Sequence, residues 1–248
     1  MSTATRAERF HRARRDPELT VLEGFHALKH ALRFGAEVLD VSAVAPERVI
    51  RLCEKLAPDL VVRFTAAITD TVNDEELARL VPRPPFTGVI AIARRRTASA
   101  EDALASPGPA PAIALIAPRH AGNLGAAVRV AAAAGAAGLV SVNGRDPWEP
   151  EAVRGAAGLQ YALPVARADS LPASDRPLVA VDPAGDPLSA EALPERALLA
   201  FGSERDGLGA DVLSRADLRI AIPMRAGVSS LNLATAVAVV LYAGRWRG

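Results

Sequence analysis

Apolar and polar positions alternate along the second half of the chain in a pattern that predicts buried strands separated by helices. Five short apolar runs are typical of buried strands, at residues 112–117, 138–142, 178–181, 197–201 and 218–222. Helical patterns lie between or after these runs, at residues 124–134, 150–159, 209–216 and 231–243. Strands that alternate with helices indicate an α/β fold with a parallel sheet.

The first part of the chain carries a weaker α/β pattern. It predicts strands at residues 19–23, 38–44, 60–64 and 87–93, and helices at 25–34, 47–56 and 73–80. A segment rich in Ala, Ser and Pro follows at residues 96–111 and has little hydrophobic periodicity. We therefore expect an N-terminal domain over residues 1–95, a linker over 96–111 and a C-terminal domain over 112–248.

The net charge of +1 conceals an uneven distribution at the N-terminus. Five arginines and a single glutamate precede Asp16, namely Arg6, Glu8, Arg9, Arg12, Arg14 and Arg15. Guanidinium groups bind phosphate bidentately, so this segment is predicted to contact nucleic acid. The alternative is a solvated, frayed terminus.

Cysteine content and hydropathy exclude several classes of protein. Cys53 is the only cysteine, which excludes an internal disulfide and a cysteine-rich zinc site. The basic N-terminus is not followed by an apolar core, and no stretch approaches the roughly 20 apolar residues of a membrane span. We expect a cytoplasmic protein with neither a membrane partner nor a metal.

Three loops that follow predicted strands carry the informative polar residues. Parallel sheets bind ligands beyond the carboxyl ends of their strands, so these loops are the expected site. In the first loop, residues 117–129, Asn123 is predicted to cap the next helix. Arg129 lies inside that apolar helix, where a buried guanidinium requires a carboxylate or phosphate partner; the alternative is a side chain that extends to the surface.

The second and third loops add a carboxylate, glycines and an amide. Glycines at 202, 207 and 209 permit close backbone approach to a ligand, and Glu204 is the predicted partner of Arg129. The alternative is a surface turn with an acidic N-cap for the next helix. In the third loop Ser229 or Ser230 is predicted to cap the following apolar helix. Asn232 is a polar amide in the first turn of that helix and needs hydrogen-bond partners.

Together the loops resemble the three signature motifs of SpoU-type (TrmH-like) RNA 2′-O-ribose methyltransferases of the SPOUT superfamily. In chain order the motif residues are Asn123, Gly125 and Arg129; Gly202, Ser203, Glu204, Gly207 and Leu208; and Ile222, Pro223, Met224, Ser230, Leu231 and Asn232. The resemblance covers about residues 112–245, and residues 146–158 resemble the family's middle stretch, with Ala156 where members often carry Ser. Residues 19–93 more loosely resemble the ribosomal-protein-like domain that many members carry in front.

The resemblance implies a fold, a cofactor and partners. The fold is an α/β C-terminal SPOUT domain, whose parallel sheet is threaded into a trefoil knot, behind a small N-terminal ribosomal-protein-like α/β domain that binds RNA. The cofactor is S-adenosylmethionine, contacted by Gly202, Ile222, Met224 and Leu231. The partners are RNA, for which the front domain favours ribosomal RNA over transfer RNA, and a second copy of the chain in a homodimer.

The resemblance also implies catalytic roles for Arg129, Glu204, Asn123, Ser230 and Asn232. Arg129 is either the general base or a cation that holds a phosphate and stabilises the developing alkoxide, and the sequence leaves both open. Glu204 is expected to orient Arg129, and the other three to complete a polar network. His120 lies beside the first motif but outside the family pattern, and we interpret it as a loop histidine.

Two other function classes fit parts of the sequence less well. A dinucleotide-dependent oxidoreductase is disfavoured because the chain lacks the G-x-G-x-x-G pattern and an acidic residue after the second strand of the domain. An RNA-binding relative without catalysis is disfavoured because Arg129, Glu204 and Asn232 are all present.

Overall fold

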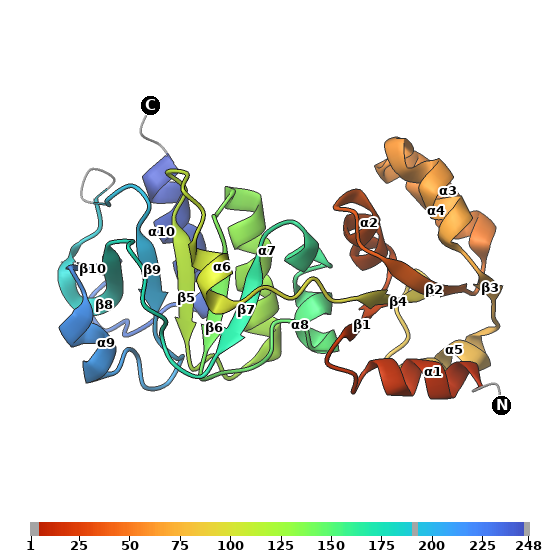
Figure 1. The fold of residues 1–248 in the computed structure, drawn as a ribbon, viewed down its shortest axis with the longest axis horizontal. Coiled ribbons are helices and arrows are strands. Elements are labelled where there is room, and N and C mark those ends of the chain that lie inside the picture. Colours follow the sequence, from red (N-terminus) through yellow and green to blue (C-terminus); the bar gives the residue numbers. More distant parts are fainter. Residues whose placement is uncertain (1–4, 190–192, 246–248) are drawn as a thin grey trace. The chain divides into compact units, whose positions relative to one another are not determined.

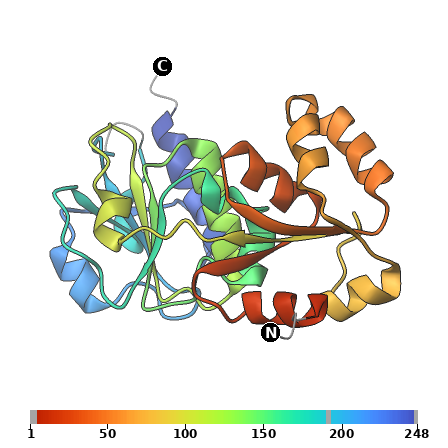
Figure 2. The same cartoon turned by 45° about the vertical axis from the view of Figure 1, so that its right-hand side comes forward.

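The computed structural model describes residues 5–189 and 193–245, with side chains as far as residue 243 (Figures 1 and 2). The chain forms two compact units. The first combines residues up to Arg96 with the segment Trp148–Ala162, and the second combines Thr97–Pro147 with residues from Leu163 onward. The sequence assigned residues 148–162 to the C-terminal domain, so the contacts divide the chain differently there.

A four-stranded mixed sheet forms the centre of the first unit. Its strands are β1 (Leu19–Glu23), β2 (Val38–Ala43), β3 (Asp70–Thr71) and β4 (Val89–Arg94), in the order β1-β4-β2-β3. β4 pairs antiparallel with β1 and β2, and β2 pairs parallel with β3. The strands predicted at 19–23, 38–44 and 87–93 are therefore confirmed.

Six helices and two 3-10 turns of the described residues accompany this sheet in the first unit. They are α1 (Arg6–Ala13), α2 (Phe25–Arg33), α3 (Pro46–Leu56), α4 (Val61–Ala67), α5 (Asp74–Leu80) and α8 (Pro150–Gly155), with 3-10 turns at Pro58–Leu60 and Leu159–Tyr161. Asn73 caps α5 in a capping box with Glu76. The predicted strand at 60–64 is wrong. Leu60 and Phe64 are buried four residues apart, which is the spacing of one helix face.

The basic N-terminus is a docked helix and not a frayed arm. Phe10 and Ala13 of α1 are fully buried in the core of the first unit. Three of the five arginines at positions 6–15 form ion pairs inside the unit, Arg6 with Asp70, Arg9 with Asp40 and Arg14 with Glu23. Arg12 and Arg15 are exposed, and their contact with RNA stays a prediction.

A six-stranded parallel sheet forms the centre of the second unit. Its strands are β5 (Ala112–Ile116), β6 (Leu139–Val142), β7 (Val165–Ala168), β8 (Leu178–Pro187), β9 (Leu198–Phe201) and β10 (Leu218–Ala221), in the order β10-β8-β9-β5-β6-β7. Every pairing is parallel. The two sheets confirm the predicted α/β fold class, with a parallel sheet in the C-terminal part of the chain. The trefoil knot stays a prediction, because strand order does not determine threading.

Helices cover both faces of this sheet (Figure 1). They are α6 (Ala100–Leu104), α7 (Ala121–Ala134), α9 (Ala210–Arg215) and α10 (Leu233–Arg245). α6 and α9 bury Leu104 and Val212 against one face, and α7 and α10 pack together on the other. α6 lies within the segment expected to be a linker, so that segment is part of the core.

A buried arginine anchors the same segment. Arg176 is 3% exposed and donates hydrogen bonds to the backbone carbonyls of Leu104, Ser106, Ala110 and Arg196 at 2.6–3.1 Å. Its guanidinium therefore ties residues 104–110 to the second unit. No helix of the described residues is long and apolar enough to cross a membrane.

Candidate active site

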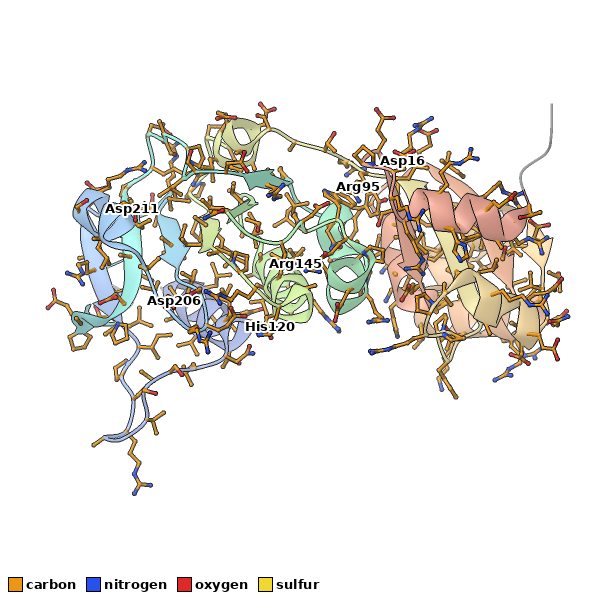
Figure 3. All side chains as sticks on the ribbon, turned by 90° about the horizontal axis from the view of Figure 1, so that it is seen from below. Asp16, Arg95, His120, Arg145, Asp206 and Asp211 are labelled. Carbon is orange, nitrogen blue, oxygen red and sulfur yellow. The ribbon has the colours of Figure 1, made fainter. Side chains whose placement is uncertain are left out.

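The three motif loops meet at the carboxyl ends of β5, β9 and β10. Figure 3 looks toward the ends of β5 and β7, whose arrows point downward in Figure 1. A cavity of about 400 Å³ opens between the loops 202–208 and 222–231. All four predicted cofactor residues line it, namely Gly202, Ile222, Met224 and Leu231, and so does the predicted catalytic Ser230. The structure thus brings these residues together in one place.

The second loop is a tight turn that forms one wall of the cavity. Ser203 and Gly207 exchange two backbone hydrogen bonds of 3.1 Å, which close the turn. Gly207 has φ +67°, a conformation that side chains disfavour. At Gly202 a Cβ atom would overlap the backbone of Gly207, so only glycine fits there. This turn presents Glu204, Arg205 and Asp206 to the cavity.

A chain of hydrogen bonds joins the polar residues of the three motifs. The Asn123 side-chain amide donates to Glu204 Oε1 at 2.8 Å. Asn123 Oδ1 in turn accepts from the Asn232 side-chain amide at 3.0 Å. Asn232 Oδ1 accepts from the backbone N–H groups of Ala234 and Thr235 at the start of α10. The network therefore fixes the second and third loops to α7 and α10.

Glu204 is an ionised carboxylate, and one of its two oxygen atoms has no hydrogen-bond donor among the described residues. Burial acts to raise the pKa of its carboxyl. The hydrogen bond from Asn123 and nearby backbone N–H dipoles act in the opposite direction and dominate, so the pKa is lowered. Its Oε2 atom is buried and accepts no hydrogen bond from the residues that the structure describes. A buried acceptor of this kind is costly unless a ligand or ordered water donates to it.

Two capping predictions are wrong, and both corrections concern asparagine. α7 begins at Ala121 with His120 as its N-cap, so Asn123 lies inside the first turn and its side chain is available to Glu204. Asn232, and neither Ser229 nor Ser230, caps α10. Because α10 begins later than predicted, the two serines remain in the exposed loop and line the cavity.

The predicted ion pair between Arg129 and Glu204 does not form. Arg129 lies six residues after Asn123 on α7, which turns it about 120° away from the side that reaches Glu204. Its side chain is exposed, so burial does not demand a partner within this chain. The prediction of a buried Arg129 is wrong because most apolar residues of α7 are alanines. Alanine is found on exposed as well as buried sides of a helix, so the sequence does not show that one side of α7 faces solvent.

One ion pair at the rim of the cavity was missed. Arg119, in the loop after β5, contacts Asp206 of the second loop at 2.6 Å, with both side chains more than half exposed. Asp206 also accepts from the Ser203 hydroxyl at 3.4 Å. No sequence signal marks this pair, because exposed loop charges have many possible partners.

A parallel sheet with a cavity at its carboxyl edge, walled by glycine turns and apolar side chains, defines a small-molecule site of an α/β enzyme. The family model described as "SpoU rRNA Methylase family" matches residues 110–242. An uncharacterised tRNA/rRNA methyltransferase of Synechocystis sp. is 32% identical over 91% of this chain and 83% of its own length. The 23S rRNA (guanosine(2553)-2′-O)-methyltransferase of Bacillus subtilis is 25% identical over 90% of this chain and 86% of its own.

A solved structure extends the likeness to the whole fold. The AdoMet-bound rRNA methyltransferase of Sinorhizobium meliloti superposes with a TM-score of 0.74 and 25% identity, covering 96% of this chain and 90% of that one. The chain belongs to the SpoU rRNA methylase family. It is an S-adenosylmethionine-dependent RNA 2′-O-ribose methyltransferase.

The cavity fits this cofactor on its own evidence. Its volume of about 400 Å³ lies within the roughly 300–1,000 Å³ of small-molecule sites. Phe201, Leu208 and Ile222 supply apolar surface, and the glycine turn allows backbone groups to approach closely. Among the described residues no cluster of three or more His, Cys, Asp or Glu side chains could hold a metal.

Proposed function

We propose that the protein methylates the 2′-hydroxyl of a ribose in ribosomal RNA. The observation that carries this proposal is the B. subtilis relative, which matches along 90% of the chain and is named for a 23S rRNA nucleotide. Transfer RNA is the second candidate, because the Synechocystis relative is named for both RNA types. The intact network of Asn123, Glu204 and Asn232 argues against a relative that only binds RNA.

Mapping 2′-O-methyl groups tests the substrate directly. The RNA of cells with and without the gene is compared nucleotide by nucleotide, for ribosomal and transfer RNA in parallel. Loss of one methyl group from ribosomal RNA is expected. Loss from transfer RNA alone would replace the proposal with the second candidate, and no loss from either would favour the non-catalytic reading.

The chain's residues orient the reacting groups. S-adenosylmethionine supplies an electrophilic methyl group, so the protein must align the ribose hydroxyl and accommodate its proton. In this proposal Glu204 remains ionised and its free Oε2 accepts a hydrogen bond from a bound ligand. Asn123 and Asn232 hold the loops in register, and Ser230 contacts the ligand from the third loop.

Arg129 acts in this proposal as a cation that binds RNA phosphate and stabilises negative charge on the ribose oxygen. The chemistry of its guanidinium supports this role, because the planar fork binds phosphate bidentately. An exposed side chain is also available to a large substrate such as RNA. Because α7 turns Arg129 away from Glu204, Arg129 acts beside Glu204 and not through it.

A homodimer completes the proposal. Apolar side chains remain exposed on α10 and on the third loop, with exposed fractions of 37% for Val239, 39% for Tyr242, 40% for Leu231 and 51% for Val228. Apolar surface gathered in this way is typical of an interface. Light scattering of the full chain at micromolar concentration is expected to give twice the chain mass. A monomer would remove the dimer from the proposal.

A further inference from the structure

Two neighbouring loops at the carboxyl edge of the parallel sheet leave their strands at strained residues. Ala117 directly follows β5 and has φ +49°, and Asn143 directly follows β6 and has φ +48°. Left-handed backbone is disfavoured for residues with a side chain, and alanine has no polar group to relieve it. Strain of this kind persists where surrounding contacts impose it, and it gathers at functional sites.

The two loops hold each other in place through their backbones. The Arg145 N–H donates to the Pro118 carbonyl at 3.2 Å, and a Cβ at Gly144 would overlap the Pro118 ring. The buried Ser141 hydroxyl donates to the Arg145 carbonyl at 2.7 Å. From β7, Arg167 Nε donates to the Gly144 carbonyl at 3.0 Å. The loop backbones are therefore built into a fixed shape.

Cationic side chains project from this fixed backbone. Residues 117–120 and 143–145 contain two arginines and one histidine, and Asp146 directly follows the second segment. Arg119, His120 and Arg145 are all exposed. Figure 3 labels His120 and Arg145 on the side where the strands end, together with Asp206 of the cavity wall. Two guanidinium forks and an imidazole at one edge suit a phosphate, which accepts several hydrogen bonds at once.

The ion pair between Arg119 and Asp206 places this surface at the rim of the cavity. The pair measures 2.6 Å, but its side chains are 52% and 61% exposed. Exposed pairs of this kind contribute little stability, so a phosphate can replace Asp206 at small cost. An RNA strand whose ribose reaches the cavity would bring the neighbouring phosphate to Arg119.

We propose that the loops 117–120 and 143–145 form a binding site for an RNA backbone phosphate beside the cofactor cavity, with Arg119, His120 and Arg145 as its donors. This inference rests on the RNA methyltransferase function. It assigns to the loop after β6, which lies outside the three motifs, a role in holding the substrate. It also assigns Asp206 the role of a competitor that occupies Arg119 until RNA arrives.

Opposite effects of two substitutions test the proposal. Arg119→Gln is expected to weaken binding of a fluorescently labelled single-stranded RNA, whereas Asp206→Asn is expected to strengthen it by removing the competitor. If both substitutions weaken RNA binding, the ion pair has only a structural role and the proposal is wrong. Thermal melting of each variant shows whether it remains folded.

Salt dependence gives a second measurement. For Arg119→Gln combined with Arg145→Gln, the slope of log affinity against log salt concentration is expected to become shallower by about 0.7, the value for one lost phosphate contact with a single strand. Arg215→Gln is the matched control. Arg215 ends α9, and the Asp217 N–H just after it donates to the carbonyl of Leu178, the first residue of β8. The control arginine therefore lies near the amino ends of the strands, away from the cavity. A slope in the double variant equal to that of wild type would overturn the proposal.

Methyl transfer by wild type separates this inference from the choice of substrate. An in vitro transcript of 23S rRNA that wild type does not methylate would count against the ribosomal substrate, while the binding measurements would still judge the phosphate site. If wild type methylates the transcript, and the double variant has the same kcat/KM and RNA affinity as wild type, the phosphate site alone is wrong. The expected result is a lower kcat/KM in the double variant with unchanged cofactor binding by calorimetry.

Discussion

Each unit contains a glutamate with a buried carboxylate oxygen, and the two carboxylates are completed in different ways. In the first unit the Glu23 side chain is 3% exposed, and each oxygen has its own arginine, Arg14 at 2.6 Å and Arg154 at 3.0 Å. In the second unit Glu204 receives one amide hydrogen bond at 2.8 Å. Its other oxygen is buried without a partner among the described residues.

The difference separates a structural site from a reactive one. Glu23 ties together α1, β1 and α8 of its unit and needs nothing further. Glu204 is ionised and incomplete, and it lies in the wall of the cofactor cavity. A buried acceptor without a partner is costly, and a ligand bound in the cavity can supply the missing donor to Glu204. Substitution of Glu23 should therefore lower stability, whereas substitution of Glu204 should lower methyl transfer.

The largest expected effect is on stability, at Glu23. Glu23→Ala leaves two arginines without their common partner, and we expect unfolding to become about 3 kcal/mol easier. Denaturant unfolding measures the change, with Glu18→Ala as the control, because the Glu18 side chain is 79% exposed. Methyl transfer per folded molecule should stay at the wild-type rate. Loss of methyl transfer without loss of stability would show that Glu23 has a functional role and not a structural one.

Arg129→Ala should lower methyl transfer by about 10²-fold, the effect of removing a group that stabilises developing charge. Cofactor binding and the melting temperature should barely change, because Arg129 is exposed and does not line the cavity. Arg129→Lys should rescue little, since one ammonium group cannot reproduce the planar fork. Single-turnover transfer of a labelled methyl group is the assay. Wild-type turnover in a folded Arg129→Ala variant would remove this residue from the mechanism.

Glu204→Gln should lower methyl transfer about tenfold or more, since a hydrogen bond to a charged group contributes roughly 1.5–3 kcal/mol. The amide keeps the shape of the side chain but loses its charge and one acceptor. Glu195→Gln is the control, because Glu195 is exposed and lies just before β9, at the amino end of the strand. If the variant loses stability as Glu23→Ala does and keeps its activity, the contrast between the two carboxylates is wrong.

The smallest effect is a pH dependence. The folded-state pKa of Glu204 lies below its usual value of 4.5. Ionised Glu204 therefore adds stability above pH 4.5, and this contribution is lost as pH falls through the lowered folded-state value. The stability difference between wild type and Glu204→Gln should shrink over that acidic range. A difference that stays constant with pH would contradict the lowered pKa.

Local sequence signals predicted much of the fold, and two missed elements had signals that were available. Thr5 and Glu8 form a capping box three residues apart, which is a helix-start pattern ahead of Phe10 and Ala13. Ser99 likewise caps α6 inside the segment expected to be a linker. β7 gave less to detect, because it is a short edge strand with only Val165 and Ala166 buried. In both segments the capping residues and the buried apolar side chains favour a helix despite the polar or Pro-rich composition.

By itself the sequence determined the family, the cofactor and the loops that carry the site, because motif residues, glycines and strand ends are local properties of the chain. Only the tertiary structure decided which polar groups meet. The partner of Glu204 is Asn123 and not Arg129, since helix α7 turns one toward the second loop and the other away. Pairing between side chains 81 residues apart depends on angles and distances that no local pattern encodes.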